Sequence, residues 1–311
     1  MKGDEFFFWG DPKSIGEDTD GSNIEKPINL AEEGVLDAAA GSHYSMIMLN
    51  DGSVVSGGFI RSIEDYKGHL GLDPDIVVQG FNTLKSVERV VDGELVSAPF
   101  FHKVFAGVEK TGNIHSILLD RNGRAYATGS NNAGQLCLGD EVDRAIPERI
   151  PVDNKIIDVA IGGEHTLLLD QFGNVYGCGS NQLGQLGLGP LIRTSSATKI
   201  TGFISSATKV SGVDIVHISA GKDHSLFHAA DAIYVTGSNS YGQLCVDTDK
   251  TELYVPTRLN LGDGIAENIK QFDAISSSSF ILYADGTANA CGKNNFGQLG
   301  DGSNEDAPIT T

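Results

Sequence analysis

The sequence is poor in several residue types that would point to particular classes of protein. Its 311 residues include one tryptophan, four cysteines and nine prolines, and only 22 lysines and arginines against 41 aspartates and glutamates. The net charge of −19 argues against direct nucleic-acid binding, which needs clustered basic side chains. No apolar run approaches the roughly 18 residues of a membrane-spanning helix. We therefore expect an acidic intracellular protein of the cytoplasm or nucleus, without a membrane span.

Sequence patterns typical of covalent catalysis and of metal binding are also missing. There is no phosphate-binding loop, no Gly-x-Ser-x-Gly elbow and no His-Glu-x-x-His motif. The cysteines show no Cys-x-x-Cys or Cys/His spacing, and they fall at equivalent places in a repeat. Equivalent places in non-adjacent repeats lie beyond disulfide reach, so we predict four reduced, buried cysteines. We expect no cofactor and no enzyme of covalent chemistry.

Glycine is abundant, with 39 residues, and much of it falls in a recurring pattern. A Gly-Ser-Asn turn is followed by Gly-Gln-Leu in three places, and Gly-Lys-Asn takes the place of the turn in a fourth. These four segments are residues 129–136, 179–186, 237–244 and 292–299. A period of about 50 to 58 residues indicates a repeat architecture whose units bury their apolar faces against their neighbours.

The first half of each unit combines a small-residue turn, a polar residue and an apolar strand. His115, His165 and His224 hold the polar place, which Tyr44 and Ser278 take in the other copies. We interpret these histidines as hydrogen-bonding residues of the fold rather than as metal ligands. A tight glycine turn follows, as at Asp51-Gly52, and predicts a β-hairpin.

About four short strands per unit, with almost no helical periodicity, predict an all-β fold. Several even sheets of antiparallel strands indicate a single β-propeller over residues 1–311. We expect six blades, with seven as the alternative, and a ring closed by the N- and C-terminal strands. The predicted division is a partial first blade at 1–36, then blades at about 37–104, 105–157, 158–215, 216–271 and 272–311.

These motifs resemble the repeat of the RCC1 (regulator of chromosome condensation) family over about residues 6–308. The resemblance implies a propeller that works through protein contacts. Some family members are nucleotide exchange factors for a Ran-type GTPase, and others are scaffolds in ubiquitin ligases, ciliary complexes or organelle assembly. A branch that senses ultraviolet light through clustered tryptophans does not fit a chain whose one tryptophan is Trp9.

One unit departs from the repeat after Gly57-Gly58, where residues 59–67 replace the usual turn. The family's Ran exchange factors have a similar departure, which forms a wedge at the nucleotide site of the GTPase. The resemblance therefore makes these residues a candidate wedge, with an ordinary surface insertion as the alternative. Ser42 and His43 stand where those exchange factors carry an acidic residue, which argues against exchange. The candidate wedge residues are Phe59, Ile60, Arg61, Glu64, Asp65, Tyr66 and Lys67.

A second candidate contact is the loop after Gly189, in which Ser-Ser-Ala-Thr-Lys occurs twice, ten residues apart. The duplication predicts a hairpin with Gly202 at its tip. It would be a locally positive finger through Arg193, Lys199 and Lys209, with a flexible loop as the alternative. The acidic residues between Asp11 and Glu33 could dock a basic partner or form a solvated loop.

We therefore predict a non-catalytic protein-binding or scaffold propeller. Its partner would be a protein, either a small GTPase or another protein with a basic surface, and the chain could belong to a larger complex. The alternative is a guanine nucleotide exchange factor for a Ran-like GTPase, acting through residues 59–67. A third hypothesis is an inhibitor or receptor-type propeller that occludes an enzyme cleft.

Overall fold

A computed structural model describes most of the chain. The described residues are 7–10, 24–29, 34–42, 44–60, 66–76, 80–86, 89–91, 94–96, 101–107, 113–190, 193–199, 204–205, 208–209, 213–230, 232–246, 248–260 and 268–310. Their regular elements are strands, joined by turns and irregular segments, with a short 3-10 helix at Pro74–Ile76. The chain divides into two compact units, Met1–Asn132 with Asp140–Lys155, and Ala133–Gly139 with Ile156–Thr311.

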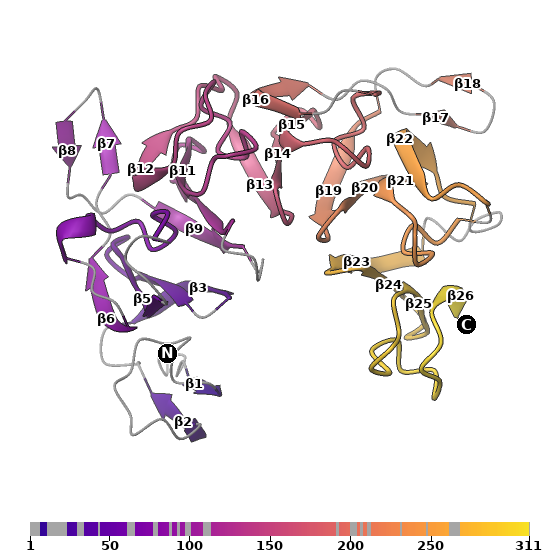
Figure 1. The fold of residues 1–311 in the computed structure, drawn as a ribbon, viewed down its shortest axis with the longest axis horizontal. Coiled ribbons are helices and arrows are strands. Elements are labelled where there is room, and N and C mark those ends of the chain that lie inside the picture. The colour runs from indigo at the N-terminus through magenta and orange to yellow at the C-terminus, as the bar shows by residue number, and fades with distance from the viewer. Residues whose placement is uncertain are drawn as a thin grey trace. The chain divides into compact units, whose positions relative to one another are not determined.

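Five sheets each contain four consecutive antiparallel strands, and we number them as blades 1 to 5 (Figure 1). Blade 1 comprises β3 (Val35–Gly41), β4 (Tyr44–Leu49), β5 (Val54–Ile60) and β6 (Gly80–Ser86). Blade 2 comprises β9 (Phe101–Ala106), β10 (His115–Asp120), β11 (Ala125–Gly129) and β12 (Arg144–Arg149). Blade 3 comprises β13 (Ile156–Ile161), β14 (His165–Asp170), β15 (Val175–Ser180) and β16 (Arg193–Lys199). Blade 4 comprises β19 (Ile215–Ala220), β20 (His224–Ala229), β21 (Ala232–Ser238) and β22 (Glu252–Arg258), and blade 5 comprises β23 (Ile269–Ile275), β24 (Ser278–Tyr283), β25 (Ala288–Gly292) and β26 (Ala307–Thr310).

Near the N-terminus, β1 (Phe7–Gly10) and β2 (Ile24–Asn29) form a two-stranded antiparallel sheet. This sheet falls within the partial first blade that the sequence predicts at 1–36. A six-blade count and closure of the ring by the terminal strands stay predictions, because β1 pairs with β2 and β26 pairs with β25 among the described strands.

Two short hairpins extend blades 2 and 4 at their outer edges. β7 (Arg89–Val91) pairs with β8 (Glu94–Val96) and lies parallel to β12, while β17 (Ile204–Ser205) pairs with β18 (Thr208–Lys209) and lies parallel to β22 (Figure 1). Gly202, the predicted tip of a hairpin, lies outside the described residues. Among the described strands, the first copy of the duplication lies in β16, which pairs with β15, and the hairpin that is present pairs Ser205 with Thr208.

Apolar side chains between neighbouring blades form the core. In one cluster, Leu186 of a Gly-Gln-Leu turn packs with Leu167 of blade 3 and with Ile215 and Phe227 of blade 4, and Leu186 is fully buried. In another, Leu244 packs with Phe272 and Ile281 of blade 5. Each such leucine contributes roughly 1.5–3 kcal/mol by leaving water. The turns therefore anchor one blade on the next, as the repeat predicts.

A hydrogen-bond relay crosses the same boundaries. The hydroxyl of Ser225 in blade 4 donates to the carbonyl of Gln185 at 2.6 Å, and it lies 2.9 Å from Nε2 of His165 in blade 3. A serine hydroxyl has one proton, so the histidine must donate through Nε2–H. The same arrangement joins His224, Ser279 and the carbonyl of Gln243 across blades 4 and 5.

Blades 1 and 2 have the same relay with different residues. Tyr44 takes the place of the histidine, and its hydroxyl lies 2.7 Å from the Ser116 hydroxyl, which donates to the carbonyl of His69 at 2.9 Å. His69 stands where other repeats have glutamine. Because the carbonyl is what the relay uses, the substitution of the side chain keeps the bond.

The glycine that precedes each relay residue is required by the ring that packs on it. A Cβ atom at Gly162 would overlap Cε1 and Nδ1 of His165, and a Cβ at Gly221 would overlap the ring of His224. The same holds for Gly41 and the ring of Tyr44. The spacing of glycine and histidine in the repeat thus follows from a contact between backbone and ring.

We expect Gly162→Ala to destabilise the protein by about 1–3 kcal/mol, because the buried His165 ring would have to leave the relay. Urea unfolding with linear extrapolation measures this change. The matched control is a double-mutant cycle with His165→Ala, which removes the ring. The cost of the alanine at 162 should largely vanish in the double variant. If the free-energy costs of Gly162→Ala and His165→Ala simply add in the double variant, contact with the His165 ring is not the reason for glycine at position 162.

Burial lowers the pKa of His224 to about 3 and that of His115 also to about 3, from the usual 6.5. The folded state therefore keeps both imidazoles neutral below pH 6.5, while the unfolded chain takes up protons. Above pH 6.5 neither state is charged and the groups contribute no pH dependence. Between pH 6.5 and about 3, the unfolded state binds more protons, so stability falls as the pH falls.

For His224, we expect the free energy of unfolding to decrease by about 1.4 kcal/mol per pH unit below pH 6.5. Between pH 6.5 and 5, the unmodified protein should lose about 2 kcal/mol more than His224→Gln, which cannot take up this proton. Urea unfolding of both proteins at several pH values tests this difference. Identical pH slopes would contradict a neutral His224 in the folded state.

Candidate functional site

The site with the best-defined construction is the end of each blade that carries the Gly-Gln-Leu turn, which we call the turn end. The first and second strands of a blade are joined there, and so are the third and fourth. In blade 3 the amide of Ser180 donates to the carbonyl of Glu164 at 2.8 Å, and in blade 4 Ser238 donates to Asp223 at 2.8 Å. The turn end therefore places Glu164 and Asp223 beside the Gly-Gln-Leu turns.

Side-chain amides hold the shape of each turn. Asn181 accepts from the Leu186 amide through Oδ1 and donates to the Gly189 carbonyl through Nδ2, both at 2.8 Å. Gln185 accepts from the Leu183 amide at 3.0 Å. Asn294, Gln298 and Leu299 repeat the pattern in blade 5. These bonds explain why asparagine and glutamine recur at fixed spacing.

In blades 3 to 5, the residue two places before the glutamine is held by the same bonds and is at least partly exposed. This residue is half-buried Leu183 in blade 3, Tyr241 in blade 4 and Phe296 in blade 5. Tyr241 is 38% exposed and Phe296 is 86% exposed. The Tyr241 ring lies 5.0 Å from Nζ of Lys293, a cation–π contact with the next blade. Blades 3 to 5 thus present an apolar or aromatic side chain at one repeated place.

The sequence analysis missed this aromatic surface, although the sequence contains its signal. The residue two places before glutamine reads Ala133, Leu183, Tyr241 and Phe296 in successive copies. Only the structure shows how far each of these side chains is exposed, from buried Ala133 to Phe296. Phe172, which is 61% exposed, lies at the opposite end of blade 3 in the turn between β14 and β15.

The candidate wedge begins as an extension of blade 1. β5 continues past Gly58, and Phe59 and Ile60 pair with Phe81 and Gly80 of β6. Since Gly58 pairs with Tyr44, this extension leaves the blade at its turn end. The structure describes only the backbone of these two residues, and Arg61, Glu64 and Asp65 lie outside the described residues.

The other end of the candidate wedge is fixed to the blades. The hydroxyl of Tyr66 donates to the Leu72 carbonyl at 2.9 Å, and the Tyr66 ring meets the His69 ring edge-on. Nζ of Lys67 lies 3.4 Å from the carboxylate of Asp143. Burial lowers the pKa of His69 to about 4, so this ring is neutral at physiological pH. Tyr66 and Lys67 are therefore engaged in contacts within the protein, and the role of the wedge stays a prediction.

The residues of the candidate finger lie on two elements. Arg193 and Lys199 begin and end β16 of blade 3, and Arg193 is exposed. Lys209 ends β18, whose hairpin lies along β22 of blade 4. Binding of a partner by these three residues stays a prediction.

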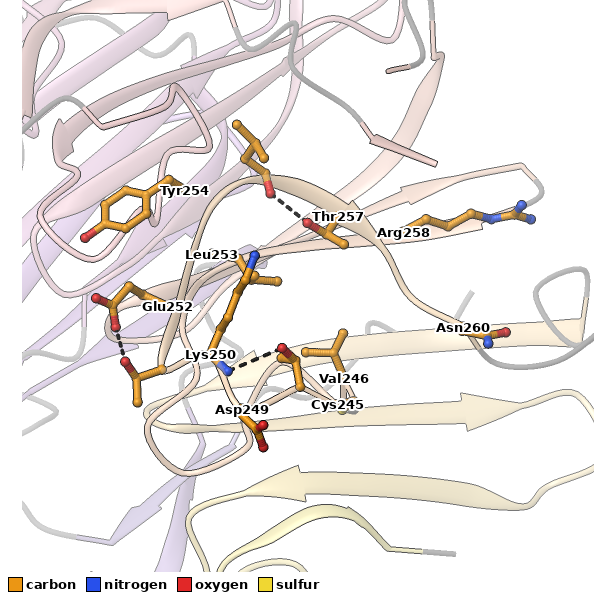
Figure 2. A pocket seen from close by; sticks show the side chains of 13 residues that line it. Cys245, Val246, Asp249, Lys250, Glu252, Leu253, Tyr254, Thr257, Arg258 and Asn260 are labelled. Carbon is orange, nitrogen blue, oxygen red and sulfur yellow. Dashed lines mark hydrogen bonds between the residues drawn. The ribbon is translucent and has the colours of Figure 1, made fainter. Parts of the chain in front are cut away.

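A surface pocket of about 1040 Å³ lies along β22 and the segment before it (Figure 2). Its lining carries both charges, with Asp249, Lys250 and Glu252 near one another and Arg258 on the far side. Cys245 and Val246 line it as well. The sequence gives no indication of this pocket, because it depends on how residues 245–251 lie against β22.

Cys245 is one of four cysteines that the structure joins in disulfides. Cys137 pairs with Cys178, with 5.4 Å between Cα atoms, and Cys245 pairs with Cys291, with 5.5 Å. The prediction of four reduced cysteines was wrong. It compared identical places in different repeats, whereas the disulfides join two different places in consecutive repeats.

Within the described parts of the chain, no three His, Cys, Asp or Glu side chains are grouped so that they could hold a metal ion. No helix in those parts is long and apolar enough to cross a membrane.

Family models and known proteins resemble this chain in its repeats. The model of the regulator of chromosome condensation (RCC1) repeat matches residues 122–169 and 173–227, and a second model of that repeat matches 156–185. A human protein described as probable E3 ubiquitin-protein ligase HERC4 is 41% identical over 187 residues, which are 60% of this chain and 17% of HERC4. The guanine nucleotide exchange factor SRM1 of Saccharomyces cerevisiae is 30% identical over 162 residues, which are 48% of this chain and 32% of SRM1. The matched stretches thus span a third or less of these relatives.

Solved structures show the same fold. Human WBSCR16 has a TM-score of 0.75 at 23% identity, with 98% of this chain and 79% of that chain covered. Prp20p of Saccharomyces cerevisiae, whose binding properties to Gsp1p and histones are described, has a TM-score of 0.52 at 17% identity, with 97% and 84% covered. The repeat matches, the four-stranded sheets and these likenesses agree: residues 122–227 contain RCC1 repeats, and the chain has the fold of an RCC1-type β-propeller.

Proposed function

We propose that this chain is a non-catalytic protein-binding propeller that engages its partner at the turn ends of blades 3 to 5. The observation that carries the proposal is the exposure of Phe296 and Tyr241 at one repeated place in neighbouring blades. Large aromatic side chains that a fold holds in water at fixed positions are typical anchors of protein interfaces. The rigid turns beneath them lower the entropic cost of binding.

The charge of the chain supports a basic partner. The net charge is −19, and the turn ends of blades 3 and 4 carry Glu164 and Asp223. A net negative charge on the chain speeds encounter with a basic protein and disfavours acidic ones. Binding to Gsp1p and histones is described for Prp20p, which has this fold, so these two proteins are reasonable probes.

We expect the chain to bind at least one of these probes with an affinity that falls as salt rises, because the attraction is partly electrostatic. Tyr241→Ala with Phe296→Ala should weaken binding about 30-fold or more, the loss of roughly 2 kcal/mol from hot-spot residues. The matched control is Phe172→Ala, which removes an exposed aromatic side chain at the opposite end of blade 3 and should leave affinity unchanged. Isothermal titration calorimetry measures the affinity of the unmodified chain, of the double variant and of the control.

Two outcomes would contradict this proposal. If Phe172→Ala weakens binding as much as the double variant, the turn ends are not the binding face. If neither probe binds at low salt, the proposed basic partner chemistry is wrong. Thermal unfolding of each variant distinguishes a lost contact from a lost fold.

Nucleotide exchange is the second candidate function, favoured by the extension of β5 and β6 beyond Gly58. Such an extension could reach into the nucleotide site of a small GTPase, and SRM1 is a guanine nucleotide exchange factor. An exchanger acts by binding the empty GTPase more tightly than the loaded form, so it lowers nucleotide affinity by the same factor.

Release of labelled GDP from a panel of small GTPases, including Ran, separates the two functions. A binding propeller should leave the intrinsic release rate unchanged. An exchanger should accelerate release, and Phe59→Ala with Arg61→Ala should abolish the acceleration. Acceleration that survives this double variant would show that residues 59–67 are not the wedge.

A further inference from the structure

The two disulfides follow one construction. Cys137 and Cys245 each come directly after a Gly-Gln-Leu sequence, and Cys178 and Cys291 each lie in the third strand of the next blade, just before its glycine. Each disulfide therefore links a turn to the blade on which that turn packs. The turns so linked are those that follow β11 and β21.

The backbone at Cys137 and Cys245 shows that the place is made for glycine. Their φ angles are 60° and 55°, in the left-handed region. The other repeats have Gly71, Gly187 and Gly300 there, with φ of 67°, 65° and 72°. A residue with a Cβ is disfavoured in this conformation. A cysteine in place of glycine is therefore explained by its bond to the next blade rather than by packing.

The residue before the glycine at the end of the third strand differs between blades, and so does the bond that it makes to the preceding turn. Where blades 3 and 5 have Cys178 and Cys291, blades 2 and 4 have Thr128 and Thr236. The Thr236 hydroxyl lies 2.8 Å from the carbonyl of Gly184 in the preceding turn, and Thr128 has the same relation to Gly68. The turns that end in Gly71 and Gly187 thus contact a threonine hydroxyl of the next blade, and the turns that end in cysteine are held by a disulfide.

The two disulfides differ in how a reagent can reach them. Cys137 and Cys178 are both fully buried, and neither lines the pocket. Cys291 is also fully buried, but Cys245 is 5% exposed and forms part of the pocket wall together with Val246 (Figure 2). Thiol–disulfide exchange requires direct attack of a thiolate on a sulfur, so access governs its rate. The pocket provides that access for one disulfide.

We propose that Cys245–Cys291 is a redox-sensitive link, opened by a dithiol that enters through the pocket, and that Cys137–Cys178 is a structural link. A thiolate of the dithiol attacks Sγ of Cys245 and releases Cys291 as a thiolate, and the second thiol of the reagent then displaces Cys245. The reagent loses two electrons and two protons and becomes a disulfide, and the protein gains them as two thiols. Opening frees the turn at 242–246 and with it the pocket wall.

This proposal does not depend on the proposed function. Its test is native-state reduction with dithiothreitol, followed by trapping of thiols with N-ethylmaleimide and mass spectrometry of the cysteine peptides. We expect Cys245 and Cys291 to be labelled at least 10-fold faster than Cys137 and Cys178. In urea, where the pocket is lost, the two pairs should be labelled at equal rates. Equal rates in the native protein, or four thiols in protein refolded with oxidised glutathione, would overturn the proposal.

A second measurement uses serine pairs and does not depend on reduction. In Cys245→Ser with Cys291→Ser, hydrogen exchange should increase at the amides of Leu244 and residue 245, which donate within the turn to Asn239 Oδ1 and to the Gly242 carbonyl. Cys137→Ser with Cys178→Ser is the matched control and should leave exchange at these two amides unchanged. If the first pair also leaves them unchanged, the disulfide does not control the turn and the proposal fails.

Discussion

The structure depends on one buried hydroxyl at each described blade boundary within a unit. Ser116, Ser225 and Ser279 each accept from the preceding blade's tyrosine or histidine and donate to a carbonyl of the preceding blade's turn. All these partners are out of water, so an unmade bond would leave a buried polar group unpaired at a cost of about 1–3 kcal/mol. The hydroxyl therefore sets the register of neighbouring blades as well as their stability. Apolar clusters such as that around Leu186 add burial energy, but they would tolerate a small shift of one blade along its neighbour. The hydrogen bonds would break under the same shift.

The turn ends inherit their rigidity from this arrangement. Gln185 uses its carbonyl for the relay and its side-chain oxygen for the Leu183 amide, so one residue fixes both the boundary and the turn. The side chain two places earlier is then held at the surface. Phe296 is exposed, and the hydrogen bond of its amide to Gln298 holds its backbone in the turn. A surface of this kind can change its side chains from blade to blade while the turn beneath it stays the same.

Much of this could be predicted from the sequence because the signal is periodic. The repeated glycine, asparagine, glutamine and leucine gave the all-β propeller class and the burial of leucines such as Leu186. Places where the repeat departs from its pattern were harder to interpret from the sequence. His69 stands in place of glutamine, but the substitution has little effect on the relay, because the relay uses the backbone carbonyl. Two identical five-residue segments suggested one hairpin, but the first segment lies in β16 and pairs with β15, which the duplication alone does not show.

The cysteines show what kind of information a repeat hides. Cys137 and Cys245 occupy the same place in two repeats that are not adjacent, and they are therefore far apart. Their equivalence does not show which cysteine each of them binds. The contact that matters joins the end of one turn to the third strand of the next blade, two places that no alignment of repeats puts side by side. The sequence does contain one clue: cysteine occupies a place that Gly187 and Gly300 hold elsewhere, and only a specific bond would favour it there.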